Sequence, residues 1–304
     1  MALGAIFPGQ GAQSVGMLAD LAEAYPSVTE KFAQSSEVLG FDVWRMVQDG
    51  PAEDLSATQN TQPILLTSSA AIWDVWQAQA DLPDFVAGHS LGEYSALCCA
   101  GAIPFEQAVA LVRLRGELME KAVPRGQGAM AAVMGLDDAD ISAACDSVEG
   151  VVVAANFNAP GQVVIAGEAA AVELASEACK AAGAKRAVML DVSGPFHSPL
   201  MAAAKEEFAE ALEAVDLSMP SVPVVQNVNA AVANDLDELK ENLLAQISAP
   251  VLWASCIQTM LGLGVESFVE CGPGSVLAGL NKRISRGTPT QGLSTPDGVS
   301  QAVA

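Results

Sequence analysis

Hydrophobic and polar positions along the chain follow the rhythm of an α/β protein, in which short apolar runs lead through glycine turns into amphipathic helices. The run 2–7 predicts a buried strand that ends at the turn Pro8-Gly9-Gln10-Gly11. The run 85–87 predicts a second strand, with a turn at 88–92 and a helix over 93–99. Further helices are expected over 17–39, 64–79 and 104–123, with Pro63 in the first turn of the second.

The middle of the chain has a different order of elements. Strands are predicted over 129–134, 151–156, 162–166 and 185–192, and helices over 137–146 and 168–182. This order, β-α-β-β-α-β, is that of a ferredoxin-like unit. Because helix and strand patterns continue on both sides of it, we interpret the unit as an insertion into a larger domain.

The remaining third returns to alternating helices and strands. Helices are predicted over 199–214, 235–246 and 253–261, and from 276 onward, with strands over 222–227 and 267–270. The last residues fit either a final strand with a short helix or a frayed tail.

Composition excludes several classes of protein. Half of the 304 residues (51%) are hydrophobic, so a sizeable core can form, and the formal net charge of −22 argues against general binding of nucleic acid or anionic membranes. No apolar run is long enough to cross a membrane and no export signal is visible, so we expect a cytoplasmic protein. The six cysteines lack CxxC spacing, so we expect free thiols and no metal site.

The strongest chemical motif is Gly88-His89-Ser90-Leu91-Gly92, a G-x-S-x-G sequence between a predicted strand and a predicted helix. This context is the one that a nucleophile elbow requires, since the glycines permit a tight turn that lets the serine stand clear. The sequence therefore predicts Ser90 as a nucleophile. The competing interpretation is an ordinary glycine turn.

A serine nucleophile needs a base, and the chain has two histidines, His89 and His197. Adjacent side chains at such a turn point apart, so we interpret His89 as structural and His197, in a predicted loop, as the base. No acidic residue stands in a motif that would identify it as the third member of a triad. A backbone carbonyl could orient the imidazole instead, which would make the site a dyad.

Several motifs occur together in one order: Phe7-Pro8-Gly9-Gln10-Gly11-Ala12-Gln13, Gly88-His89-Ser90-Leu91-Gly92-Glu93-Tyr94, an arginine about 25 residues later, Asn156-Phe157-Asn158 and Phe196-His197-Ser198. In this combination the chain resembles the malonyl-CoA:acyl-carrier-protein transacylases of bacterial fatty-acid synthesis. The resemblance extends from Ala2 to about Arg286.

The resemblance implies catalytic roles. Ser90 would be the nucleophile and His197 its base, and the backbone carbonyl of Gln246 would orient the histidine. The backbone N–H groups of Gln10 and Leu91 would form the oxyanion hole.

It also implies substrate contacts. Arg115 matches the arginine that holds the free malonyl carboxylate, and a guanidinium fork suits that group. Arg113, two residues away, should be a solvated surface residue. Gln62, Met119 and Asn158 match positions that line the cleft, and Phe196 matches the form of the motif that selects malonyl over branched groups.

We therefore predict an α/β fold: an α/β-hydrolase-like catalytic domain formed by residues 1–125 and 195–304, with an inserted ferredoxin-like subdomain at 126–194. The expected reaction is ping-pong transfer of malonyl from malonyl-CoA to the phosphopantetheine thiol of acyl carrier protein, with no permanently bound cofactor. A monomer is the default expectation.

Acyl carrier protein is itself acidic, so a chain of charge −22 would repel it unless basic residues gather near the cleft. Two clusters are candidates for docking. The first holds Lys185 and Arg186 with Lys180, and the second Lys282 and Arg283 with Arg286. The alternative interpretation is solvated surface charge.

Other functions remain open at this point. A stand-alone acyltransferase of polyketide synthesis would share nearly every residue named above. A serine esterase or thioesterase could use the same elbow, although the predicted arginine and the missing triad acid disfavour it. A carrier-protein-binding subunit without activity would not need Ser90, His197 and both oxyanion positions.

Overall fold

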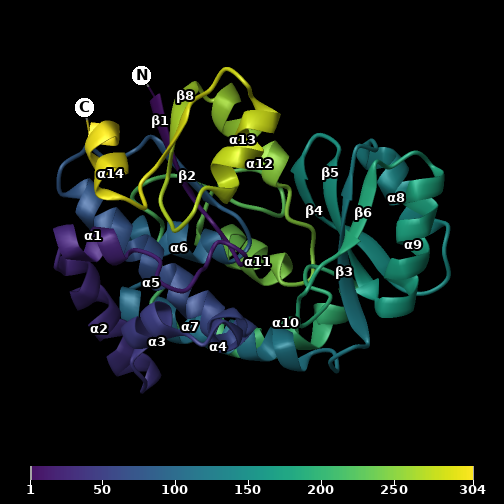
Figure 1. The fold of residues 1–304 in the computed structure, drawn as a ribbon, viewed down its shortest axis with the longest axis horizontal. Coiled ribbons are helices and arrows are strands. Elements are labelled where there is room, and N and C mark those ends of the chain that lie inside the picture. The colour runs from purple at the N-terminus through teal and green to yellow at the C-terminus, as the bar shows by residue number, and fades with distance from the viewer. Residues whose placement is uncertain (1, 304) are drawn as a thin grey trace.

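The computed structural model describes residues 2–303, and its larger sheet has five parallel strands in the order β7-β2-β1-β8-β9 (Figure 1). The bounds of these strands are β1 Ala2–Phe7, β2 Phe85–Gly88, β7 Val224–Val225, β8 Val265–Glu270 and β9 Thr290–Gly292. The strand expected over 222–227 is thus shorter, because Gln226 and Asn227 leave the sheet to bond Glu93.

Helices cover both faces of this sheet, and successive side chains of β1 point alternately to the two faces. Ala5 and Phe7 point into the main core, while Ile6 points to the opposite face, where helices α12 and α13 pack. The helices are α1 Ala19–Ala24, α2 Ser27–Leu39, α3 Val43–Asp49, α4 Ala52–Ser56, α5 Thr58–Gln77, α6 Leu91–Cys99, α7 Phe105–Lys121, α10 Ala202–Glu213, α11 Leu236–Gln246, α12 Trp253–Gly262, α13 Val276–Ile284 and α14 Pro296–Val303, with a short 3₁₀ turn at Pro199–Met201.

The helix expected over 64–79 begins earlier, at Thr58, so the placement of Pro63 in a first turn was wrong. Proline has no N–H, and the carbonyl of Gln59 four residues earlier therefore lacks its helical donor. Arg113 supplies one, with Nη1 3.3 Å from that carbonyl. Arg113 also bonds Glu117 at 2.6 Å, so it is not the freely solvated residue that we expected.

Two other expectations change at the ends of the chain. The predicted helix 17–39 is divided at Tyr25 and Pro26 into α1 and α2. The C-terminal residues form β9 and α14, which is the ordered alternative. Helices α3 and α4 were not anticipated.

Residues 128–189 form a separate antiparallel sheet in the order β4-β5-β3-β6, to the right in Figure 1. The element order β-α-β-β-α-β is as predicted. Its members are β3 Gly128–Met134, α8 Asp138–Asp146, β4 Val152–Ala159, β5 Gln162–Glu168, α9 Ala169–Ala181 and β6 Arg186–Met189. In β3, Ala131 and Val133 pack under α8 and α9, while Met130 and Ala132 join the main core.

All six cysteines are free thiols. Among the helices of residues 2–303, none has the length and apolar character needed to cross a membrane.

Candidate active site

The elbow after β2 carries Ser90 on a strained turn. Its backbone angles are φ 53° and ψ −108°, outside the regions that a serine ordinarily adopts. Gly88 and Gly92, on either side of the turn, have no Cβ, and the neighbouring backbone therefore packs directly against them. A Cβ added to Gly88 would lie 1.9 Å from the carbonyl of Gly92, and one added to Gly92 would lie 2.0 Å from the carbonyl oxygen of Phe7 in β1. The two glycines therefore let α6 start directly against the sheet.

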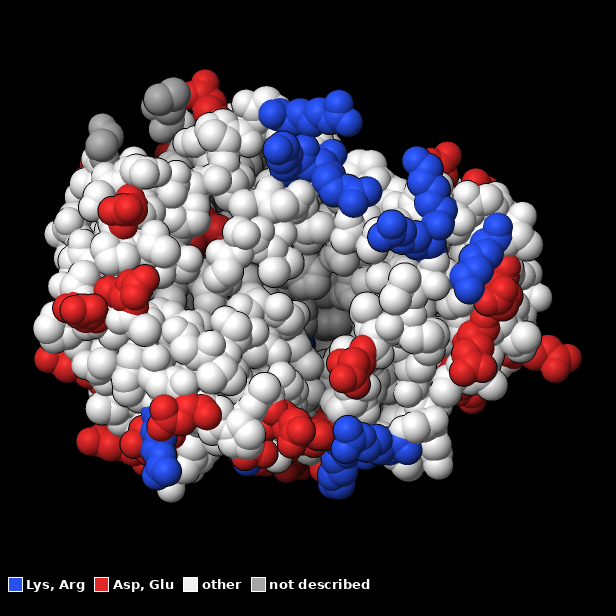
Figure 2. All heavy atoms as spheres, viewed as in Figure 1, with Lys and Arg blue, Asp and Glu red and all other residues white. Residues whose placement is uncertain are grey.

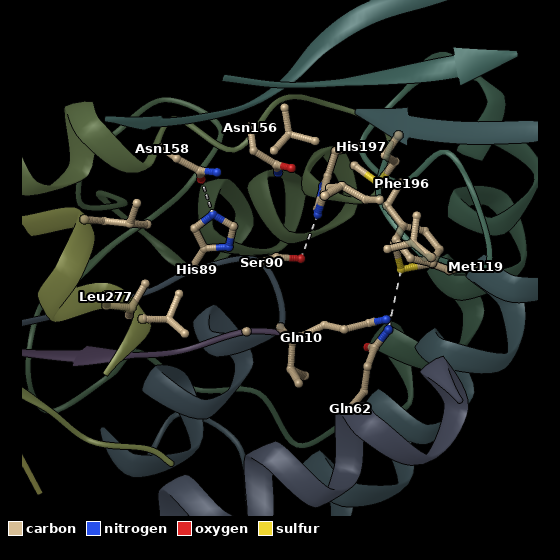
Figure 3. A pocket seen from close by; sticks show the side chains of 18 of the residues that line it. Gln10, Gln62, His89, Ser90, Met119, Asn156, Asn158, Phe196, His197 and Leu277 are labelled. Carbon is tan, nitrogen blue, oxygen red and sulfur yellow. Dashed lines mark hydrogen bonds between the residues drawn. The ribbon is translucent and has the colours of Figure 1, made fainter. Parts of the chain in front are cut away.

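Ser90 and His197 form a hydrogen-bonded pair, as the sequence predicted. The Ser90 hydroxyl lies 2.7 Å from Nε2 of His197 (Figure 3). Nδ1 of the imidazole lies 2.8 Å from the backbone carbonyl of Gln246. A carbonyl can only accept, so the proton sits on Nδ1 and Nε2 is free to accept from serine. Burial, followed by the charge of Arg115, lowers the pKa of His197 to about 3.

Arg115 reaches the same place from α7 and is buried. Its Nη1 donates to the Gln62 side-chain oxygen and its Nη2 to that of Gln246, both at 2.8 Å, and Nη2 lies 3.4 Å from the Ser90 hydroxyl. The guanidinium also stacks 5.1 Å from the Tyr94 ring centre. Its Nε has no hydrogen-bond partner within the described chain. Two neutral amides thus hold a buried cation beside the nucleophile.

The two predicted oxyanion positions border the same cavity. Neither the Gln10 N–H nor the Leu91 N–H has an acceptor among residues 2–303. Gly9 lets the loop after β1 lie directly against the elbow, since a Cβ there would be 2.5 Å from the His89 carbonyl oxygen. Leu91 is the first residue of α6, so the positive end of the helix dipole adds to its N–H.

The remaining predicted cleft residues also line this cavity, and they come from four separate elements. Gln62 lies on α5 and donates to the Met119 sulfur at 3.8 Å. Asn158 lies on β4, and its side-chain oxygen is 2.7 Å from Nε2 of His89 (Figure 3). The His89 ring points away from the serine hydroxyl and its centre lies 5.7 Å from that of Trp253, in agreement with a structural role.

The rest of the cavity wall is mostly apolar. It combines residues of the small sheet and its exit loop with residues of α13: Met130, Val164, Leu190, Val192, Phe196, Val276, Leu277 and Leu280. The space-filling view shows this face of the molecule hollowed near its centre (Figure 2). These side chains give the cavity next to Ser90 a largely apolar lining.

Sequence reasoning missed the polar cluster behind the elbow. Glu93 is fully buried, and its carboxylate accepts from the backbone N–H of Asn227 at 2.9 Å and from the side chain of Gln226 at 3.2 Å. The Asn227 side chain accepts from Ser90 N–H at 2.8 Å and donates to the Gly88 carbonyl at 2.7 Å. The available signal was Glu93 itself, a charged residue among apolar neighbours of a short helix.

The predicted docking residues are exposed and lie in two groups. Arg186 is the first residue of β6 and Lys185 directly precedes it, and Lys282 and Arg283 lie near the end of α13. In Figure 2 basic side chains gather along the upper rim of the hollow, over these two elements. Neither group forms an ion pair with a described residue, apart from Lys180, which pairs with Glu177 at 2.7 Å.

No group of three or more histidine, cysteine, aspartate or glutamate side chains suited to a metal ion occurs among the residues that the structure describes.

The fold and the site together are those of an acyltransferase, and comparison with known families agrees. A family model described as "Acyl transferase domain" matches residues 5–291, so the chain belongs to that family. Within it, the chain belongs with the malonyl CoA-acyl carrier protein transacylases. The enzyme of that name from Salmonella typhimurium is 52% identical over 301 residues, which cover 98% of this chain and 97% of that protein. The Bacillus subtilis enzyme is 46% identical, with 98% and 95% covered.

Solved structures give the same result for the fold. An acyl carrier protein S-malonyltransferase from Vibrio cholerae is 50% identical and superposes with a TM-score of 0.97, over 99% of this chain and 100% of that one. The malonyl-transacylase that was solved in complex with its type II polyketide-synthase acyl carrier protein is 48% identical, with a TM-score of 0.98 over 100% and 99%.

Proposed function

We propose that this chain transfers the malonyl group of malonyl-CoA to the phosphopantetheine thiol of acyl carrier protein through a malonyl-Ser90 intermediate. The observation that carries the proposal is the position of one hydroxyl. Ser90 Oγ lies 2.7 Å from an imidazole nitrogen and 3.4 Å from a buried guanidinium nitrogen, in a cavity whose wall is mostly apolar. A hydrolase of neutral esters has no use for that cation.

The first half-reaction acylates the serine. His197 Nε2 accepts the hydroxyl proton as Ser90 Oγ attacks the thioester carbonyl, and the tetrahedral oxyanion accepts hydrogen bonds from the N–H groups of Gln10 and Leu91. When the intermediate collapses, the carbon–sulfur bond breaks and His197 returns the proton to the departing CoA thiolate. The Gln246 carbonyl stabilises the transient imidazolium through Nδ1.

The second half-reaction reverses these steps with a different thiol. The phosphopantetheine thiol gives its proton to His197 and attacks the malonyl ester, after which Ser90 recovers the proton. The apolar wall accommodates the pantetheine arm of either donor or acceptor, so one cavity serves both halves of a ping-pong cycle.

Arg115 supplies selectivity for a dicarboxylic acyl group. Gln62 and Gln246 each occupy one of its five N–H donors, and N–H groups remain for a bidentate contact with the malonyl carboxylate. Phe196 and Met119 border the same space and would exclude a branch on the acyl chain.

A role in polyketide synthesis is the second candidate, and one observation favours it. The malonyl-transacylase of a type II polyketide-synthase carrier protein matches this chain as well as the Vibrio cholerae enzyme does. The acyl transfer would be the same, and the two roles differ in which carrier protein accepts the malonyl group.

We also propose the domain division expected from the sequence, with a hydrolase-like domain at 1–125 and 195–304 and a ferredoxin-like one at 126–194. The antiparallel order β4-β5-β3-β6 with two helices on one face supports the second assignment. The expected cytoplasmic location and monomeric state stay predictions.

The two basic groups at the rim would receive the carrier protein. Lys185, Arg186, Lys282, Arg283 and Arg286 have no acidic partner within residues 2–303, in a chain with 36 acidic residues. Exposed apolar side chains lie beside them, Val188 and Met189 on β6 and Val276 on α13. An apolar centre with a basic rim fits an acidic partner that must insert its thiol arm between the two groups.

The function is tested by the mass of the intact protein after brief mixing with malonyl-CoA or acetyl-CoA. We expect a malonyl adduct that is absent from Ser90→Ala and that disappears when carrier protein is added. Arg115→Ala should lose the preference for malonyl, by about tenfold or more for a lost charge-assisted pair. An adduct that decays equally fast in water alone would identify a hydrolase, and no adduct would contradict catalysis by Ser90.

A further inference from the structure

The side chain of Gln246 lies between a buried cation and a buried acid. Its oxygen accepts from Nη2 of Arg115 at 2.8 Å, and its nitrogen donates to a carboxylate oxygen of Glu93 at 3.0 Å and to the Ser90 carbonyl at 2.9 Å. All three side chains are fully or almost fully buried. Arg115 and Glu93 therefore face each other through one neutral amide instead of forming a direct ion pair.

This amide has one orientation that satisfies its neighbours. A guanidinium can only donate, so the amide oxygen must face Arg115. On the other side lie the Ser90 carbonyl, the Glu93 carboxylate and the side-chain oxygen of Asn227 at 3.3 Å, all of which accept. A reversed amide would set donor against donor at the arginine and acceptor against acceptor at the acid, which is costly at buried positions.

We propose that Glu93 is a positioning residue for malonyl selectivity, because its carboxylate fixes the Gln246 amide so that the amide oxygen holds Arg115 in place. The inference rests on the proposed function of Arg115. Glu93 touches no reacting atom, and it acts through Gln246.

The indirect arrangement has a physical advantage for a site that must receive an anion. A carboxylate bonded directly to Arg115 would occupy the two N–H groups that a substrate carboxylate needs, and would compete with it. A neutral amide uses one N–H of Nη2 and leaves the second, which points toward Ser90. Burial raises the pKa of Glu93 to about 7, and the ionised carboxylate compensates the charge of Arg115 without occupying its N–H groups.

The Glu93 carboxylate is held by donors from several elements, so its own position is fixed. One oxygen accepts from the Asn227 backbone and from Gln246, and the other accepts from Gln226. These donors come from the segment after β7 and from α11, whereas Glu93 belongs to the first turn of α6.

Two variants separate geometry from charge, and a third is their control. Glu93→Gln keeps the size and removes the charge, while Glu93→Asp keeps the charge and withdraws the carboxylate by one carbon–carbon bond. Glu270→Gln makes the same charge change in another buried glutamate, on β8, whose carboxylate accepts from the backbone N–H groups of Leu277 and Ala278 and has no hydrogen bond to Gln246. The readout is the ratio of the rates at which malonyl-CoA and acetyl-CoA acylate Ser90, together with KM for malonyl-CoA.

We expect the malonyl-to-acetyl ratio to fall about tenfold in both Glu93 variants, through a higher KM for malonyl-CoA, and to stay within about twofold of wild type in Glu270→Gln. Equal losses for both acyl groups would mean that Glu93 is merely structural and would overturn the proposal. A higher ratio in Glu93→Gln would also overturn it, since the acid would then act as a competitor of the substrate. Failure of the wild-type chain to prefer malonyl refutes the proposed function instead.

A measurement on the unchanged chain covers the case in which the variants do not fold. The side-chain amide protons of Gln246, followed by nuclear magnetic resonance, should exchange with solvent much more slowly than those of an exposed glutamine. Rapid exchange would show that the amide is not held, and would overturn the proposal.

Discussion

His197 is kept as a neutral imidazole by its position. It is buried, it lies near the permanent charge of Arg115, and its Nδ1 proton is bonded to the Gln246 carbonyl. Burial and the nearby cation disfavour a second proton, while the carbonyl favours it, and the balance lowers the pKa to about 3. His197 is therefore already unprotonated at Nε2, and able to act as a base, at neutral and mildly acidic pH.

The same pKa shift links the stability of the fold to pH. Stability falls as the pH drops below about 6.5, because the His197 side chain of the unfolded chain then binds a proton that the folded chain does not.

The neutral imidazole of His197 predicts a flat pH profile for the serine. An uncharged sulfonyl fluoride reacts with Ser90 and His197 without using Arg115, so its rate reports the base alone. Between about pH 5 and 8 we expect less than a twofold change, whereas a histidine with the usual pKa of about 6.5 would slow the reaction roughly 30-fold at pH 5. Ser90→Ala gives the background rate. A midpoint near pH 6.5 would contradict the assigned environment.

At the scale of elements, the sequence indicated the strands and helices wherever a local pattern determined them. The elbow was predictable because the G-x-S-x-G motif, when it lies between a strand and a helix, is largely specific to nucleophile elbows. The start of α5 was not, since Pro63 is tolerated by a donor from Arg113, 50 positions away in the chain. Glu93 was missed for the same reason, because its donors come from residues 226–246. Contacts between distant segments leave no local pattern.

The packing of α6 on β1 gives a prediction about glycine. Gly92 and Gly279 both lie inside helices, but a Cβ at Gly92 would lie 2.0 Å from the Phe7 carbonyl oxygen and one at Gly279 would meet nothing within 4 Å. Gly92→Ala should destabilise the protein by about 1–3 kcal/mol or more and impair acylation of Ser90. Gly279→Ala should be neutral or stabilising by up to about 1 kcal/mol. Urea unfolding and adduct formation measure both, and equal stabilities would contradict the close packing.

At the scale of the whole molecule, charge is distributed unevenly. Six basic residues are paired with acids. Five of them lie outside the rim groups, namely Lys31, Arg45, Arg113, Lys121 and Lys240, and the sixth is Lys180 of the first group. The five basic residues at the rim form no such pair within residues 2–303, so their positive charge is exposed to solvent without a neutralising partner. A chain of net charge −22 can therefore present a local positive surface where its cavity opens.

Charge reversal tests whether this surface receives the carrier protein. Arg186→Glu with Arg283→Glu changes the net charge by −4, and Arg45→Glu with Lys121→Glu makes the same change on α3 and α7, where both residues are exposed and paired. We expect the first pair to raise KM for carrier protein about tenfold, less at high salt, and to leave KM for malonyl-CoA within about twofold. The second pair should change neither by more than about twofold. Equal effects of the two pairs would mean that net charge alone matters, and equal effects on both substrates of the first pair would contradict a docking site.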